Sequence, residues 1–369
     1  MSALRKILIL CVIFLSLLIL WYLLLQRSEI QKLPTNSYQA GQEGFLDWVV
    51  GSSAPSFQAT PTGAQTNELM AITSTTVGPG VTTYDITALG DLPLREYCIK
   101  ASYNTACTGR YMNLEMIKYV LARGCRFLDF EIYVVDGFPV VACSNDPTGL
   151  TWQSNNYLVL NDVFLTIMHY AFQAPSPNLG DPLFIQLRIF SADTPIHNDI
   201  ATAIQTILGP RHYNGYVSGD KTYMSDLMGK IVIINDQTIS TFNSNVVNMQ
   251  SGSVHMLKYS PEEISDMLVN KVHVIDSTQL SDVKTLCMVE LDKSKQKTSR
   301  FNMLSYLIPS SPITGLDITY LVQNYGVQIV ECPFYLTGSV LTNYEQFFAD
   351  NKTAFVPFYR ALPYLGVKS

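Results

Sequence analysis

Two carboxylates, Asp129 and Glu131, are the residues of this sequence whose type and spacing most directly suggest chemistry. They lie two positions apart in an otherwise apolar run, Phe-Leu-Asp-Phe-Glu-Ile-Tyr-Val-Val, at residues 127–135. In an extended strand the side chains at positions i and i+2 point to the same face, so both carboxylates face the same side. Such a pair can bind a divalent cation, or it can pair with a buried positive charge.

The other side chains that could bind a metal or act as bases are scattered. The sequence has five histidines, at positions 169, 197, 212, 255 and 273, and no two of them have metal-ligand spacing. Any one of them could still reach the carboxylates from another strand. Seven cysteines are present without a Cys-x-x-Cys pair, so a zinc site is not expected, and their number alone does not decide whether disulfides form. Cys143 could act as a nucleophile, although buried cysteines usually only pack.

Short β-rich runs alternate with helical patterns from about residue 92 onward. Residues 127–135 and 138–142 predict a hairpin, because Asp136-Gly137 between them is a strong turn signal. Residues 114–122 have helical periodicity, with Asn113 as the N-cap. Further strands are predicted at 98–102, 183–189, 230–234, 254–258, 271–275, 286–291, 327–331 and 354–357, and further helices at 161–172 and 199–208. Roughly eight buried strands that alternate with helices predict an α/β fold, a closed TIM-like β/α barrel over residues 91–369.

Residues 7–25 predict a transmembrane helix. This run contains no charged side chain, and at 1.5 Å per residue it spans about the ~30 Å hydrocarbon core of a bilayer. A cleaved signal peptide is the alternative, but no small-residue cleavage site follows the run. Basic residues flank both ends of the run, so the orientation of the helix in the membrane is only weakly determined. The positive charge of the free amino terminus slightly favours a cytoplasmic N-terminus. We expect a single-pass anchor with a cytoplasmic N-terminus and the barrel on the opposite side.

Residues 28–90 are expected to form a linker between this anchor and the barrel. The stretch 51–83 is dense in Ser, Thr, Gly, Pro and Ala, and such a composition buries too little apolar surface to offset chain entropy. An apolar island at 45–50 could dock on the barrel or on the membrane. The net charge of −6 and the lack of a long basic run argue against a nucleic-acid partner.

Several motifs follow one another in a fixed order along the chain. They are Lys-Ala-Ser-Tyr-Asn-Thr at 100–105, Arg-Gly-Cys-Arg-Phe-Leu-Asp-Phe-Glu at 123–131, Asp-Gly-Phe-Pro-Val-Val at 136–141, Leu-Met-Gly-Lys-Ile at 227–231 and Gly-Val-Gln-Ile-Val at 326–330. This set resembles the X and Y regions of phosphoinositide-specific phospholipase C, a family of phosphoric diester hydrolases. The resemblance runs from about residue 92 to residue 357. It implies the distorted β/α barrel of that family, in agreement with the strand pattern.

The catalytic histidines of that family are absent at the matching positions. The family uses one histidine as a general base and a second to assist the leaving group. The resemblance places Tyr103 at the first position, and Asn145 or a neighbour within 143–146 at the second. A phenol with an unperturbed pKa near ~10 is a poor base at neutral pH, and an amide cannot act as a general acid. The lysines that hold the inositol phosphates correspond to Ile234 and Asp236.

The metal site of the family is altered as well. Its calcium ion is held by an Asn, by two carboxylates on one strand and by a Glu on the next. The resemblance assigns Asn104, Asp129 and Glu131 to the first three positions, with Asp and Glu exchanged in order, and Arg188 to the fourth. A guanidinium has no lone pair for calcium, but it can place a fixed positive charge between the two carboxylates. Calcium binding is therefore disfavoured, no other cofactor is expected, and Arg188 becomes a candidate substrate-binding residue.

The combined losses predict a membrane-anchored pseudoenzyme, which is a phospholipase-C-like barrel kept for ligand binding or for a structural role. An active metal-independent phosphodiesterase that uses Arg188 in place of calcium is one alternative. A purely structural, membrane-displayed domain is another, in which Asp129, Glu131 and Arg188 form only a buried salt-bridge network. Besides the membrane, a phospholipid or an anionic headgroup is the expected partner.

Overall fold

The computed structural model describes most of the chain after residue 62. The described residues are 63–74, 80–144, 152–219, 221–236, 241–250, 254–259, 304–309, 318–319, 322 and 328–361, of which 254–259 and 304–309 are described by their backbone. They belong to one compact unit, Gly63–Ser369. The predicted transmembrane helix at 7–25, the predicted strands at 271–275 and 286–291, and Asn145 lie outside them. Among the described helices, none combines the length and the apolar character that crossing a bilayer requires.

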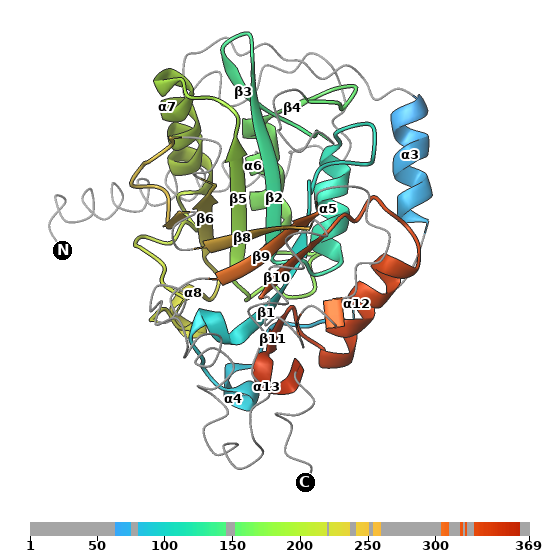
Figure 1. The fold of residues 1–369 in the computed structure, drawn as a ribbon, viewed down its shortest axis with the longest axis vertical. Helices are drawn as coiled ribbons and strands as arrows, with labels where there is room; N and C mark the ends of the chain where they lie inside the picture. The colour runs from blue at the N-terminus through green and yellow to red at the C-terminus, as the bar shows by residue number, and fades with distance from the viewer. Residues whose placement is uncertain are drawn as a thin grey trace, which may run out of the picture. The chain divides into compact units, whose positions relative to one another are not determined.

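Eight strands of the described residues follow one another in a single parallel path (Figure 1). Their order is β7-β6-β5-β2-β1-β10-β9-β8, and every ladder along this path is parallel. The strands are β1 (Tyr97–Ser102), β2 (Phe127–Val135), β5 (Leu183–Ile189), β6 (Ile231–Asn235), β7 (Met249–Gln250), β8 (Val254–Tyr259), β9 (Leu304–Pro309) and β10 (Ile329–Cys332). Strand β10, the last of this path in chain order, pairs with β1, the first. This parallel order confirms the predicted β/α barrel fold, although the described residues include no ladder between β7 and β8 that would close it.

Three further strands pair antiparallel to this path. Strand β3 (Phe138–Ala142) pairs with β2, β4 (Leu158–Val159) pairs with β3, and β11 (Phe355–Pro357) pairs with β1. The turn between β2 and β3 contains Asp136 and Gly137 with φ angles of 50° and 83°. Both residues of a type I′ turn need positive φ, so the hairpin forms where Asp-Gly predicts it.

Helices connect the strands and cover the barrel. They are α3 (Gly63–Thr73), α4 (Ile86–Leu89), α5 (Leu114–Ala122), α6 (Leu160–Tyr170), α7 (Thr194–Ala203), α8 (Met224–Leu227), α12 (Ser339–Asn351) and α13 (Phe358–Ala361), with a 3-10 turn η1 (Leu94–Glu96) and a π-helical turn η2 (Ile204–Leu208). The side chain of Asn113 accepts a hydrogen bond from the backbone N–H of Glu115, which confirms the predicted N-cap of α5. The helix predicted at 199–208 begins earlier, at Thr194, because Pro195 is compatible with the first turn of a helix.

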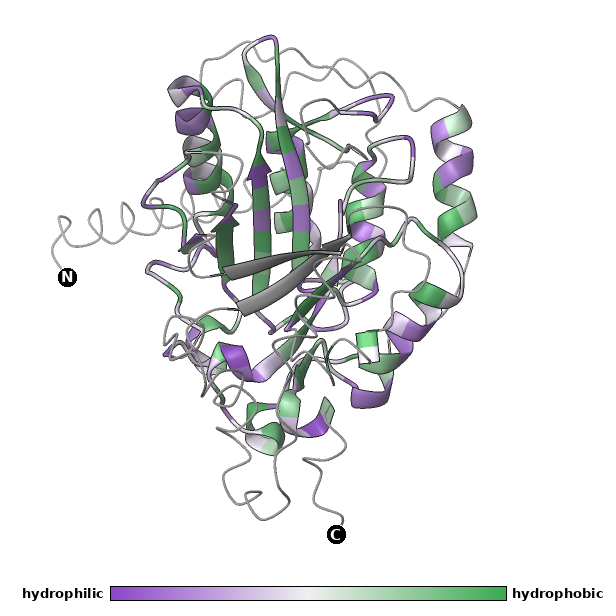
Figure 2. Cartoon of the chain, in the orientation of Figure 1, coloured by the Kyte–Doolittle hydropathy of each residue, from purple (hydrophilic) through white to green (hydrophobic). Residues whose placement is uncertain are grey.

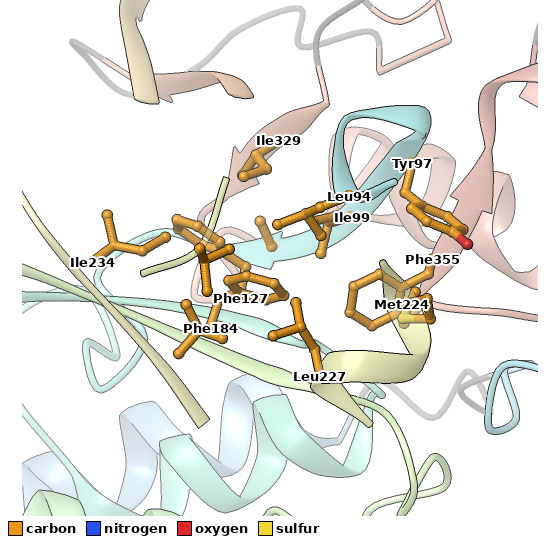
Figure 3. Close-up of a cluster of buried hydrophobic side chains, with 14 of the residues drawn as sticks. Leu94, Tyr97, Ile99, Phe127, Phe184, Met224, Leu227, Ile234, Ile329 and Phe355 are labelled. Atoms are coloured by element: carbon orange, nitrogen blue, oxygen red, sulfur yellow. The ribbon is translucent and has the colours of Figure 1, made fainter. Parts of the chain in front are cut away.

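Most of the barrel interior is apolar. Side chains along a strand alternate between the inside and the outside, and the inward positions of β1, β2, β5, β6 and β10 meet in one cluster (Figure 3). Its labelled members are Leu94, Tyr97, Ile99, Phe127, Phe184, Met224, Leu227, Ile234, Ile329 and Phe355. Burial of a large apolar side chain contributes about 1.5–3 kcal/mol relative to exposure, so this layer stabilises the barrel on which the polar strand ends depend.

An ion-pair network joins α12 to the outside of the barrel. Lys100 of β1 points outward, and its Nζ donates to the backbone carbonyl of Arg123 at 2.6 Å. Glu345 of α12 accepts from Arg123 Nε at 2.6 Å and lies 3.5 Å from Lys100 Nζ. All three side chains are buried, so each charge is compensated by a neighbour.

The expected linker ends earlier than residue 90. Residues 63–73 form α3, and Val81 and Tyr84 are each only 3% exposed. Tyr84 donates its backbone N–H to Asp181 Oδ1 at 2.7 Å, and its hydroxyl donates to the backbone carbonyl of Gly90 at 2.8 Å. A few large apolar residues, such as Val81 and Tyr84, are buried although the surrounding composition is rich in Ser and Thr. The expectation of an irregular linker is therefore wrong for the described residues of this stretch.

Substitution of Gly124 tests whether the segment around Val81 packs against the barrel. Gly124 has φ +78°, and a Cβ at this position would clash with Val81 Cγ2 and lie 3.3 Å from Pro177 Cγ. Gly137 has a similar φ of +83° with nothing within 4 Å, so it is a matched control for backbone strain alone. We expect Gly124→Ala to lower the free energy of unfolding by about 1–3 kcal/mol more than Gly137→Ala does, as measured by urea denaturation. Equal losses for the two variants would show that Val81 does not pack here.

Candidate functional site

The ends of three neighbouring strands bring four of the expected residues together. Asp129 and Glu131 lie on β2, Arg188 lies on β5, and Asn104 follows β1. In the β2–β5 ladder Glu131 is paired with Arg188, and the inward alternation that places Phe127 and Phe184 in the apolar cluster continues to these residues. Polar bands interrupt the apolar colouring of β2 and β5 in Figure 2. The predicted convergence of the four residues is confirmed.

Arg188 is the centre of this cluster. Its Nε donates to Asp129 Oδ1 at 2.7 Å and its Nη2 donates to Asp129 Oδ2 at 2.5 Å, so this pair is bidentate. Its Nη1 donates to Glu131 Oε1 at 2.9 Å, and its Nη2 also donates to Asn104 Oδ1 at 2.8 Å. The guanidinium thus uses four of its five N–H groups within the cluster.

The remaining bonds to the two carboxylates come from nearby loops and from β2 itself. Glu131 Oε1 also accepts from Asn104 Nδ2 at 3.1 Å. Its Oε2 accepts from the Tyr133 hydroxyl at 2.9 Å and from the backbone N–H of Ser144 at 2.8 Å. The backbone N–H of Asn104, a residue with φ +43°, donates to Asp129 Oδ2 at 3.0 Å. Glu131 therefore accepts four hydrogen bonds, which fills the lone-pair directions of a carboxylate.

Burial and charge act against each other in this cluster. Asp129 and Glu131 are 0% and 2% exposed, and Arg188 is 6% exposed. Burial by itself lowers the pKa of Arg188, but the two carboxylates raise that pKa well above its ordinary value, so the guanidinium keeps its charge. Burial raises the pKa of Glu131 above its ordinary value and the negative charge of Asp129 adds to this, while Arg188 and the hydrogen bonds from Asn104 and Tyr133 offset part of the rise. Because Glu131 accepts all four of its bonds, we assign it as a carboxylate.

These residues do not fit a calcium ion. Calcium requires six to eight oxygen ligands with lone pairs directed at the metal. The side-chain oxygens of Asn104, Asp129 and Glu131 instead accept bonds from Arg188, whose fixed charge repels a cation. In the part of the chain that the structure describes, no group of three or more His, Cys, Asp or Glu side chains is arranged to hold a metal ion.

Tyr103 lies beside the cluster but does not provide a base. Its ring centroid is 5.0 Å from Arg188 Cζ, a cation–π arrangement. Burial raises the pKa of its phenol further above the ordinary value, although Arg188 acts in the opposite direction. The phenol is therefore neutral at physiological pH. Asn145, the other degenerate position, lies outside the described residues.

The histidine side chains that the structure describes hydrogen-bond or pack elsewhere. His197 Nε2 lies 2.8 Å from the backbone carbonyl of Ser191, and His212 Nε2 lies 2.8 Å from the backbone carbonyl of Val246. His169 packs edge-on against its neighbour Tyr170. None of these three contributes a hydrogen bond to the cluster around Arg188. The side chains at 255 and 273 lie outside the described residues.

The two residues that the resemblance assigns to the family's substrate lysines, Ile234 and Asp236, carry no positive charge. Ile234 belongs to the apolar cluster of the interior, and Asp236 is 1% exposed just after β6. An acidic group at the second position would repel a phosphate rather than bind it. The positive charge of Arg188, within the described residues of this site, is already paired with carboxylates.

A further carboxyl group in the interior was not anticipated from the sequence. Glu331 of β10 is 0% exposed and is paired in register with Ala101, an inward residue of β1. Neither of its carboxylate oxygens has a hydrogen-bond partner among the described residues. Burial, together with the negative charge of Asp129, raises the pKa of Glu331 well above its ordinary value. The sequence did contain a signal for this buried carboxyl. Glu331 ends the apolar run 327–331, and such a run is typical of a strand that is buried on both faces.

Comparisons with known proteins find one protein family and several solved structures that are similar to this chain. Residues 90–237 match the family described as phosphatidylinositol-specific phospholipase C, X domain. The crystal structure of L. pealei PLC21 is similar with a TM-score of 0.52 at 16% identity, over 73% of this chain and 38% of that protein. The crystal structure of S. officinalis PLC21 has a TM-score of 0.46 at 15% identity, with the same coverages of 73% and 38%. A calcium-dependent phosphoinositol-specific phospholipase C from Pseudomonas sp. has a TM-score of 0.45 at 8% identity, over 76% of this chain and 99% of that one.

These matches differ in what they establish. The X-domain match confirms the family resemblance, and the similarity to L. pealei PLC21 supports the barrel fold. The chain spans 38% of the length of each of the two PLC21 proteins. No curated protein matches the sequence.

The unpaired carboxyl of Glu331 predicts a pH-dependent stability. Its pKa is raised in the folded state above the ordinary 4.5, so folding favours the protonated form. Below about pH 4.5 the Glu331 carboxyl is protonated in both the folded and the unfolded state, so it does not affect stability. At higher pH this carboxyl ionises only in the unfolded state. The free energy of unfolding then falls by up to ~1.4 kcal/mol per pH unit. We therefore expect Glu331→Gln to gain stability relative to the unmodified protein as pH rises from 5 to 8.

Chemical denaturation at several pH values measures this difference. Glu115→Gln on α5 is the matched control, because the Glu115 side chain is 37% exposed. Its difference from the unmodified protein should change little with pH. A difference for Glu331→Gln that is equally flat would contradict a buried, protonated carboxyl at this position.

Proposed function

We propose that this chain, whose residues 90–237 match the X domain of phosphatidylinositol-specific phospholipase C, is a non-catalytic, membrane-anchored barrel of that family. In this proposal the fold is kept for binding or for a structural role, and the phosphodiester hydrolysis of the family is lost. The hydrogen bonds of Arg188 to Asp129, Glu131 and Asn104 carry the proposal. They place a permanent guanidinium among the residues that correspond to the calcium ligands of the family.

Each chemical requirement of the family's reaction is unmet in the described residues. A calcium ion has no available oxygen cage, because the candidate ligands are committed to Arg188. A base is missing, because Tyr103 is neutral at physiological pH and no described histidine bonds to the cluster. The inositol phosphates have no lysine at the positions of Ile234 and Asp236. These deficits support the loss of turnover independently of one another.

The cluster also makes the centre of the barrel a poor site for an anion. Asp129 and Glu131 together carry one more charge than Arg188 supplies, so the cluster is negative overall. A phosphate placed there would meet net repulsion in a region of low dielectric constant. A phospholipid or anionic headgroup would therefore bind outside this centre. The anchor at residues 7–25 supplies the membrane contact in this proposal, with the barrel on the side opposite the cytoplasm.

A metal-independent phosphodiesterase is the second candidate function. One observation favours it: the four hydrogen bonds of Arg188 leave one N–H of Nη1, which could contact a phosphate oxygen. A guanidinium can stabilise the charge that develops on a transferring phosphoryl group. The proton transfers of the reaction would still need a base and an acid that the described residues do not supply.

An activity assay on the full chain tests the main proposal. We expect no hydrolysis of phosphatidylinositol or its phosphorylated forms in mixed vesicles, with calcium or with a chelator. General acid–base help is worth ~10²–10⁴-fold per proton transfer, so a rate at least about 10⁴-fold below that of an active relative is expected. Robust turnover that Arg188→Ala abolishes and the surface variant Arg110→Ala preserves would overturn the proposal in favour of the phosphodiesterase.

Calcium binding by Arg188 variants tests the ion-substitution argument separately. Arg188→Glu provides a fourth oxygen ligand beside Asn104, Asp129 and Glu131, whereas Arg188→Gln removes the charge without adding a carboxylate. Isothermal titration should show calcium affinity highest for the Glu variant, and that variant should remain inactive because Tyr103 is not a base. Equal calcium affinities of the two variants would mean that these residues do not form the remnant of a calcium site.

A further inference from the structure

Two cysteine thiols lie in contact next to the cluster. The Sγ atoms of Cys107 and Cys143 are 3.0 Å apart, and the two residues are 2% and 5% exposed. Cys107 lies in the loop after β1, and Cys143 directly follows β3. An S–S bond of about 2.05 Å needs an approach of only ~1 Å from this position.

The backbone holds both residues in place without any help from sulfur. Cys107 donates its backbone N–H to the carbonyl of Asn104 at 2.8 Å, and it forms an isolated antiparallel bridge with Met112. The carbonyl of Cys143 accepts from the backbone N–H of Gln153 at 2.8 Å and of Ser154 at 3.1 Å. Backbone hydrogen bonds therefore fix both loops in positions where the two thiols face each other.

The two loops are also tied to each other. Met112 donates its backbone N–H to Asn156 Oδ1 at 2.7 Å, and Asn156 Nδ2 donates to the Met112 carbonyl at 3.0 Å. Asn155 donates its backbone N–H to the carbonyl of Arg110 at 2.8 Å. Closure of a disulfide would add a covalent link to segments that these hydrogen bonds already join, so it requires little rearrangement.

The other described cysteines behave differently. Cys98, Cys125 and Cys332 are buried, and in the described part of the chain none of them makes a sulfur–sulfur contact of the kind between Cys107 and Cys143. They therefore serve as internal comparisons for burial without pairing.

We propose that Cys107 and Cys143 form a disulfide in the mature protein. The two thiols lose two protons and two electrons as the S–S bond forms, and a disulfide of the glutathione or protein-oxidoreductase class accepts them and is reduced to two thiols. Such bonds persist in oxidising compartments, which agrees with the expected placement of the barrel across the membrane from the cytoplasm.

The link would clamp both segments that hold Glu131. Asn104 lies three residues before Cys107, and its Nδ2 donates to Glu131 Oε1. Ser144 directly follows Cys143, and its backbone N–H donates to Glu131 Oε2. The disulfide therefore closes a covalent ring of residues 107–143 that contains Glu131, and it limits the separation of the two loops that bond to this carboxylate.

Peptide mapping of the full chain tests this proposal. The protein is refolded in a reduced/oxidised glutathione buffer, its free thiols are alkylated, and the digest is analysed by mass spectrometry without reduction. We expect a peptide that links Cys107 to Cys143, with Cys98, Cys125 and Cys332 alkylated after denaturation. Alkylation of both Cys107 and Cys143, or a link from either one to a different cysteine, would overturn the proposal.

Thermal unfolding with and without a reductant gives an independent readout. Reduction should lower the Tm by roughly 5–10 °C, because the closed loop constrains the unfolded chain. Cys107→Ser/Cys143→Ser should lack this shift, whereas the control Cys98→Ala should keep it. Hydrogen exchange of the Ser144 amide should also be faster after reduction. If the double variant fails to fold, the peptide map and the reductant dependence of the unmodified protein still decide the question.

Discussion

The pairing of Arg188 with Asp129 and Glu131 is the interaction on which the chemistry of this barrel depends. Three ionised groups lie inside a protein core, where an unpaired charge is far too costly to keep. The bidentate contact to Asp129 and the single contact to Glu131 satisfy them together. The same bonds consume the oxygens that a metal ion would need, so one arrangement explains both the stability of the cluster and its unsuitability for calcium.

The rest of the barrel supports this arrangement. Strands β2, β5 and β1, which position the cluster, also supply Phe127, Phe184 and Ile99 to the apolar layer. This packing fixes the register of the strands and therefore the height of each polar side chain. Glu331 of β10, in register with Ala101 of the apolar layer, is buried without a hydrogen-bond partner among the described residues. Burial and the negative charge of Asp129 raise the pKa of Glu331, so a third ionised acid beside Asp129 and Glu131 is disfavoured.

Local features of the sequence predicted much of this architecture, whereas features that arise from long-range contacts escaped it. Strands β2, β3 and β5 and helix α5 have the predicted bounds, because period-two burial, an Asp-Gly turn and an Asn cap are local signals. The docking of Val81 against Gly124 and the contact of Cys107 with Cys143 join residues far apart in the sequence, and no local pattern encodes such pairs. The convergence around Arg188 was predictable because the ordered motifs located each residue at a strand end.

A double-mutant cycle between Arg188 and Asp129 tests the central interaction most directly. The free energies of unfolding of Arg188→Gln, Asp129→Asn and the double variant are compared with that of the unmodified protein in urea. Arg188→Gln leaves Asp129 and Glu131 without their cation, and Asp129→Asn leaves Arg188 with Glu131 alone. The double variant replaces the Arg188–Asp129 pair with neutral groups. The account predicts a coupling energy of about 2 kcal/mol or more. Losses that add to within ~0.5 kcal/mol would contradict it, because they would show that the two side chains do not depend on each other.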